Sequence, residues 1–218
     1  MVSERVLGAV LNLLFIGNSL TASNDLAALI EAMGRASGVA LHCTVVAKPD
    51  FSLEDHWADG EVRRTIARGG WSHVILQQGP SALPESRVLL NDYARRFDHD
   101  IRSVNARTAL FSVWPAAVRR GDFDRVSASY AGAARLTGGL VLPAGDAWRA
   151  AWRRDPALAL YGPDGLHPSP LGSYLAALAI FHALTGELPP VASAPAGGSG
   201  RQLEILRAAV IETRRRGQ

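Results

Sequence analysis

The chain has 218 residues, 48% of them hydrophobic, and its 23 basic and 20 acidic side chains give a formal net charge of +3. This length suits a single α/β domain over residues 1–218, large enough to bury roughly 70–75% of its unfolded surface. The basic residues are scattered among acidic ones, which argues against a nucleic-acid partner, and the single cysteine, Cys43, excludes an intrachain disulfide and a cysteine-based metal site.

The first apolar stretch, Val6–Ile16, resembles the hydrophobic region of a signal peptide. Glu4 and Arg5 give it only a weakly positive start, and no small-residue cleavage site lies ahead of Ser19. No other run reaches the length of a membrane-spanning helix. We therefore predict a cytoplasmic protein with no membrane partner.

Strand-like and helix-like segments alternate along the chain, which predicts a parallel sheet covered by helices on both faces. The expected strands are Leu11–Ile16, Leu41–Ala47, His73–Gln77, Thr108–Trp114 and Leu140–Leu142. The expected helices are Asp25–Ser37, Leu53–Arg68, Glu85–Asn105, Phe123–Leu136, Asp146–Arg153, Ser169–Thr185 and Arg201–Arg215. Asn24 is expected to cap the first helix and Gly38 to end it. Pro189–Gly200, rich in Pro, Ala and Gly, is expected to be a surface connection.

Five short strands with crossover helices predict a three-layer α/β/α sandwich of flavodoxin-like type. Such sheets bind their ligands outside the carboxyl ends of the strands. Three segments should therefore meet at one edge: Ser19 after the first strand, the loop at residues 50–52 after the second, and residues 77–80 after the third.

Ser19 is the candidate nucleophile, because it follows a buried strand and a glycine in Phe-Ile-Gly-Asn-Ser-Leu-Thr, residues 15–21. A serine hydroxyl needs a histidine to take its proton and an acid to orient that histidine. Asp164 and His167 supply both, three residues apart in a Gly/Pro-rich loop ahead of a long apolar helix. Taken alone, Ser19 reads as a helix cap and Asp164 as a turn residue. Together with His167 they indicate a catalytic triad.

Gly-Asn-Ser-Leu at residues 17–20 and Asp-Gly-Leu-His-Pro-Ser at residues 164–169 resemble the first and last sequence blocks of the SGNH, or GDSL-type, hydrolases. The resemblance spans Phe15 to about Gly186, with Asn18 standing where the name-giving motif has Asp. It implies that the serine of the first block attacks and that the Asp and His of the last block complete the triad. It also implies the strand order 2-1-3-4-5.

In that family the oxyanion is held by the serine N–H, the N–H of a second-block Gly and the side chain of a third-block Asn. Here the second-block loop is Asp50-Phe51-Ser52 with no Gly, so we expect a backbone N–H at Phe51 or Ser52 to serve. Gln77 and Gln78 stand in place of the Asn, and a glutamine amide carries the same donor. We expect Gln78 to take this role, with Gln77 as the alternative. These departures indicate a divergent branch of the superfamily.

Two further side chains are candidates with open alternatives. His56 either lines the site or packs against its neighbours at the start of a helix. Trp114 either offers a flat face to a sugar or an acyl chain, or closes the core at the end of the fourth strand. Asp55, His56 and Asp59 match no metal-binding spacing, so we expect no metal site. A serine-based triad needs no cofactor, and we expect none.

These features predict a serine esterase that cleaves a small O-acyl ester through an acyl-enzyme. An acetyl group on a carbohydrate is the favoured substrate, because that activity recurs in the SGNH family. A lipid esterase or thioesterase is one alternative, although no amphipathic lid is evident. A catalytically inactive carbohydrate-binding module is the other, because the usual third-block Asn is missing.

Overall fold

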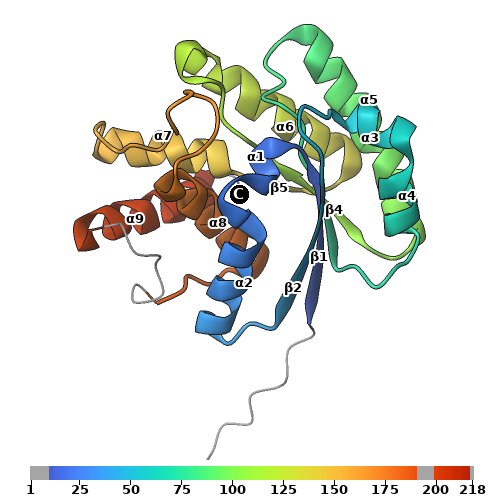
Figure 1. Cartoon of the computed structure of the whole chain (residues 1–218), viewed down its shortest axis with the longest axis horizontal. Helices are drawn as coiled ribbons and strands as arrows, with labels where there is room; N and C mark the ends of the chain where they lie inside the picture. Colours follow the sequence, from blue (N-terminus) through green and yellow to red (C-terminus); the bar gives the residue numbers. More distant parts are fainter. Residues whose placement is uncertain (1–9, 191–198, 217–218) are drawn as a thin grey trace, which may run out of the picture.

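A computed structural model of the protein describes residues 10–190 and 199–216. Val6–Ala9 and the middle of the Pro189–Gly200 connection lie outside the described residues. Five parallel strands form the sheet in the order β2-β1-β3-β4-β5 (Figure 1). The strands are β1 (Leu11–Gly17), β2 (Leu41–Ala47), β3 (His73–Leu76), β4 (Arg107–Phe111) and β5 (Leu140–Leu142). The predicted sheet and strand order are confirmed.

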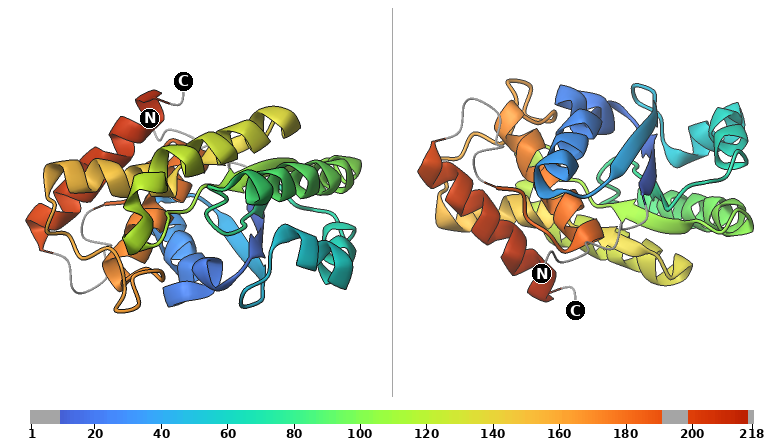
Figure 2. Two further views of the ribbon diagram at one scale, coloured as in Figure 1. Left: turned by 90° about the horizontal axis from the view of Figure 1, so that it is seen from above. Right: turned by 90° about the horizontal axis from the view of Figure 1, so that it is seen from below.

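Helices cover both faces of the sheet, which makes the predicted three-layer sandwich. One layer contains α2 (Leu26–Ser37) and α8 (Pro170–Thr185), and the other contains α5 (Pro84–Ser103) and α6 (Phe123–Thr137). Figure 2 shows these layers on opposite sides of the strands. The shorter α3 (Leu53–Asp59) and α4 (Glu61–Ile66) pack beside α5, and α7 (Ala144–Arg154) and α9 (Gly200–Arg216) pack on α8.

Helix α8 is apolar on all sides because other elements surround it. Every residue from Gly172 to His182 is buried, against α2, α7, α9 and β5. A helix that is hydrophobic all round belongs in the core of a protein or in a membrane. Within residues 10–190 and 199–216, no helix has both the length and the apolarity to cross a membrane.

Three expectations about the elements are wrong. The helix expected at Leu53–Arg68 is interrupted by Gly60, which adopts a left-handed conformation (φ 75°) between α3 and α4. Strand β4 ends at Phe111 instead of Trp114, because its pairing with β5 ends where Phe111 faces Leu142. The cap of α2 is Asp25, whose Oδ1 accepts the Ala28 N–H at 3.3 Å, and not Asn24. Gly38 ends that helix, as expected, at φ 68°.

Short helical turns at the carboxyl edge of the sheet were not predicted. The four-residue α1 (Ser19–Ala22) and the 3-10 turn η1 (Ser23–Asp25) follow β1 directly, and a second 3-10 turn, η2 (Ala117–Asp122), follows β4. The first of these turns places Ser19 at the same edge as the loops that follow β2, β3 and β4.

Candidate active site

The backbone turns sharply at Asn18, between the end of β1 and the start of α1. Asn18 caps α1, since its Oδ1 accepts the Leu20 N–H at 3.1 Å. Ser19 is therefore the first residue of a helix, and its own backbone N–H has no acceptor within that helix. The turn leaves Ser19 half-buried at the edge of the sheet.

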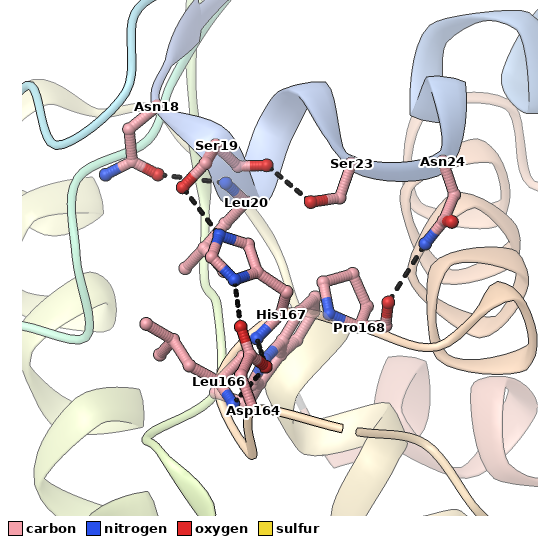
Figure 3. Close-up of polar contacts among 10 residues, drawn as sticks. Asn18, Ser19, Leu20, Ser23, Asn24, Asp164, Leu166, His167 and Pro168 are labelled. Atoms are coloured by element: carbon pink, nitrogen blue, oxygen red, sulfur yellow. Dashed lines mark hydrogen bonds and ion pairs between the residues drawn. The ribbon is translucent and has the colours of Figure 1, made fainter. Parts of the chain in front are cut away.

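The structure brings Ser19, His167 and Asp164 into one hydrogen-bonded chain (Figure 3). His167 Nε2 lies 2.9 Å from Ser19 Oγ, and His167 Nδ1 lies 2.5 Å from Asp164 Oδ2. The carboxylate is oriented in turn by two backbone N–H groups, those of Leu166 at 3.0 Å and His167 at 2.9 Å, which donate to its Oδ1. One ring nitrogen thus faces a hydroxyl group and the other a carboxylate, the arrangement that a histidine base requires.

The hydrogen bond from His167 lowers the pKa of Asp164 to about 2, and the backbone N–H groups of Leu166 and His167 act in the same direction. Donors that bind the charged form of a carboxyl group favour ionisation. Asp164 therefore stays ionised across the whole neutral and mildly acidic range, as the partner of a histidine base must.

This pKa provides a test of the Asp164–His167 contact. In a 13C NMR titration of the native protein, the Asp164 carboxyl signal is expected not to titrate between about pH 5 and pH 3. In a His167→Ala variant the largest cause of the shift is lost, so the pKa should rise towards its ordinary value of 3.8. The signal should then titrate in that window. The same titration curve in both proteins would contradict the contact.

The loop that carries Asp164 and His167 is anchored to the segment that follows β4. Trp114 Nε1 donates to Leu166 O at 2.9 Å, Ala117 N to Gly165 O at 2.7 Å, and Tyr161 Oη to Pro115 O at 2.6 Å. These three bonds join the loop to the segment that runs from β4 into η2.

Trp114 holds this loop from inside the core. Its side chain is fully buried and stacks on Trp148 at a centroid distance of 3.8 Å and an interplanar angle of 8°. The expectation that it faces a substrate is therefore wrong, and the alternative of a core tryptophan is confirmed.

His56 does not line the site. It is fully buried, and its Nε2 lies 2.7 Å from Gly17 O. A carbonyl can only accept, so Nε2 must carry the proton. Burial lowers the pKa of His56, which keeps the ring neutral, and the Phe51 ring packs edge-on against it with centroids 5.1 Å apart. The packing alternative is correct, and His56 holds the end of β1.

Gln77 also holds the turn that carries Ser19, and its side chain is too buried to meet an oxyanion. Its Oε1 accepts the Asn18 N–H at 2.9 Å and the Thr21 hydroxyl at 2.7 Å, and its Nε2 donates to Gln78 O at 2.6 Å. The Asn18 N–H can only donate, so the Gln77 amide atom that faces it must be the oxygen. Gln77 is fully buried, and it ties the end of β3 to the first turn of α1.

Gln78 is committed elsewhere as well. Its Oε1 accepts the Leu53 N–H at 3.3 Å, and its Nε2 donates at 3.1 Å to both Ser81 Oγ and the Ser86 carbonyl. Both amide hydrogens are therefore in use. The expectation that either Gln78 or Gln77 supplies the third oxyanion donor is contradicted by these contacts of Gln78 and by the complete burial of Gln77.

The expectation for Phe51 and Ser52 is wrong for the same reason. The Phe51 N–H donates to Lys48 O at 3.2 Å and closes a turn, while the Ser52 N–H donates to Asp55 Oδ2 at 2.8 Å. Ser52 caps α3 in a capping box with Asp55. The Ser-x-x-Asp spacing of this box is visible in the sequence and could have been recognised.

Asp50 has the free N–H in this loop. Within residues 48–53, all of which the structure describes, the N–H groups of the other residues have acceptors, and Pro49 has no N–H group. The Asp50 N–H has no acceptor among the described residues. Its φ of 61° fits the third position of a turn with proline before it, where glycine is favoured. Asp50 thus adopts a backbone conformation that is more usual for glycine.

No protein-family model matches the chain, and no curated protein matches it. Among solved structures, it is similar to a DUF4886 family protein from Bacteroides uniformis at 20% identity and a TM-score of 0.77, over 94% of this chain and 95% of that one. It is also similar to a protein from Slackia heliotrinireducens named provisionally as an SGNH hydrolase, at 23% identity and a TM-score of 0.66, over 81% and 100% of the chains. The chain has the fold of the SGNH hydrolases.

A third neighbour with this fold is a variant of an acetyl xylan esterase from Geobacillus stearothermophilus, at 15% identity and a TM-score of 0.64, over 82% of this chain and 96% of that one. These identities are low, so the similarity concerns the fold, and the chemistry has to be argued from the side chains themselves.

Proposed function

We propose that the protein is a serine esterase with Ser19 as its nucleophile. One observation carries this proposal: His167 lies between the Ser19 hydroxyl at 2.9 Å and the Asp164 carboxylate at 2.5 Å. The three residues come from opposite ends of the chain, 148 positions apart for Ser19 and His167. A base within hydrogen-bond reach of a hydroxyl group, and itself oriented by an acid, is the geometry of an activated serine.

In the proposed mechanism, His167 Nε2 takes the proton from Ser19 Oγ as the oxygen attacks the ester carbonyl carbon. Asp164 stabilises the imidazolium that forms. His167 then gives the proton to the leaving alcohol, which departs as the acyl-enzyme forms. A water molecule, deprotonated by His167, attacks the acyl carbon, and the proton returns to Ser19 as the acid is released.

For the oxyanion we propose two backbone donors, the N–H groups of Ser19 and Asp50. Ser19 qualifies because the first residue of a helix has no internal acceptor for its N–H. Asp50 qualifies because its N–H is the one in this loop that has no acceptor in the described part of the chain. The loop also lies against the turn that carries Ser19, since Asn18 Nδ2 donates to Phe51 O at 3.2 Å. A missing third donor would cost about 3–4 kcal/mol of transition-state stabilisation.

The substrate we propose is a small O-acyl ester, with an acetyl group on a carbohydrate as the first choice. Its support is the acetyl xylan esterase among the structural neighbours. In a carbohydrate ester the acyl group is small and most of the recognition concerns the alcohol. A lipid ester would instead need room for a long acyl chain.

A series of nitrophenyl esters from acetate to palmitate, together with acetylated xylo-oligosaccharides, tests this assignment. Acetate is expected to react fastest among the nitrophenyl esters, with kcat/KM falling as the acyl chain lengthens, and acetate should be released from the oligosaccharide. A rate that rises with chain length would identify a lipid esterase or thioesterase instead. No hydrolysis by folded protein, alongside sugar binding, would indicate a non-catalytic binding module.

A further inference from the structure

The side-chain amide of Asn24 bridges two segments that are far apart in the sequence. Its Nδ2 donates to Pro168 O at 2.9 Å and to Ser173 Oγ at 2.8 Å. Figure 3 shows the first of these bonds running from the segment just after α1 to the loop that carries His167. Asn24 lies in η1, five residues after Ser19, and Pro168 directly follows His167.

The other hydrogen bonds of these two segments are made with different parts of the chain. The Ser19 turn is held by Gln77, His56 and the loop after β2, whereas the His167 loop is held by the segment after β4. Among the hydrogen bonds of the described residues, only two join residues 18–25 to residues 161–168. One is the Ser19–His167 bond itself, and the other is the bond from Asn24 to Pro168.

We propose that Asn24 is a positioning residue that sets the distance between Ser19 Oγ and His167 Nε2. The proposal rests on the esterase function argued above. The amide fixes Pro168 O, and with it the backbone beside the imidazole, relative to the helix that carries the nucleophile. The second bond, to Ser173, joins the same nitrogen to the first turn of α8. The position of the Asn24 amide is therefore fixed by two partners.

Asparagine suits this position for two reasons. The backbone of Asn24 is left-handed, with φ 52°, a conformation that Asn adopts more readily than most residues. The amide also provides two hydrogens on one nitrogen, which can meet a carbonyl and a hydroxyl group together. An aspartate would keep the size and the turn but would set an acceptor against the Pro168 carbonyl.

The test compares Asn24→Asp and Asn24→Gly with Asp25→Gly. Asp25 has the same left-handed backbone, with φ 51°, but its side chain caps α2 and does not reach the loop. Both Asn24 variants are expected to lower kcat roughly 10- to 100-fold with little change in KM, because misplacement of about 1 Å costs on that order. Asp25→Gly should keep kcat within about threefold of the native protein.

A purely structural role would give a different pattern. Asn24 is an exposed residue, so its loss should lower the Tm by no more than Asp25→Gly does. Native kcat in Asn24→Asp, or an equal loss in Asp25→Gly, would overturn the proposal.

If the native protein is inactive, the proposed function fails. The positioning role of Asn24 is then tested by NMR, from the 15N signals of the His167 imidazole. Asn24→Asp should shift or broaden these signals and Asp25→Gly should leave them unchanged. Identical signals in all three proteins would overturn the positioning role independently of activity.

Discussion

Replacing Ser19 with alanine is expected to abolish labelling by a fluorophosphonate probe and to lower kcat by roughly 10⁴- to 10⁶-fold. In the proposed mechanism, Ser19 Oγ is the atom that attacks the ester, and the same atom should react with the probe. Peptide mass spectrometry of the labelled native protein should find the phosphonate on Ser19. Because Ser19 is half-buried at the start of a short helix, the variant should fold normally.

Ser23→Ala provides the matched control. Ser23 lies one turn further along the same segment, and its hydroxyl donates to Ser19 O at 2.6 Å without contacting His167. Its loss should leave labelling in place. His167→Ala should reduce labelling to near that of Ser19→Ala, because the proton acceptor is missing. Labelling that persists in Ser19→Ala, or that maps to another serine, would contradict the assignment of Ser19 as the nucleophile.

The fold was largely predictable from the chain because its signals are local. Apolar runs such as Leu41–Ala47 and Leu140–Leu142 gave strands with the observed bounds, and Gly38 ended α2 as expected. The strand order followed from the family resemblance. The interruption at Gly60 was missed because a glycine within a helical pattern fits either a continuous helix or a break.

The charged part of the site was also predictable, whereas its surroundings were not. Asp164 and His167 lie three residues apart, and a Gly-Asn-Ser motif lies near the other end of the chain. These two features together predicted that the three side chains meet. Gln78 and Trp114 were placed at the correct edge of the sheet, but their side chains turn inward. The direction of a side chain after a strand depends on which buried donors and acceptors need partners, and those belong to segments distant in the sequence.

Three residues near the candidate site share one structural role. Gln77 binds the Asn18 N–H, His56 binds Gly17 O, and Phe51 O accepts from Asn18 Nδ2. All three hold the turn between β1 and α1: Gln77 from the end of β3, His56 from α3 and Phe51 from the loop after β2. The proposed nucleophile lies at this sharp turn, and catalysis would require its geometry to be held within a fraction of an ångström.

Gly17→Ala tests this frame directly and is expected to lower the free energy of unfolding by about 3 kcal/mol. A Cβ at Gly17 would lie 2.3 Å from both Gln77 Oε1 and Thr21 Oγ1. Neither atom can yield easily, because the two are hydrogen-bonded to each other in a fully buried position. Relief of the clash must therefore displace Gln77 from the Asn18 N–H and loosen the turn that carries Ser19. We expect kcat to fall by roughly 100-fold as well.

Gly79→Ala separates this clash from the general cost of replacing a glycine beside the site. Gly79 follows β3 as Gly17 ends β1, yet a Cβ there would meet no atom within 4 Å. Urea unfolding should therefore show Gly79→Ala close to the native protein and Gly17→Ala well below it. Equal stability of the two variants would mean that Gln77 and Thr21 can move aside without cost. In that case the turn is held by His56 and the loop after β2 alone, and Gln77 fills space beside it.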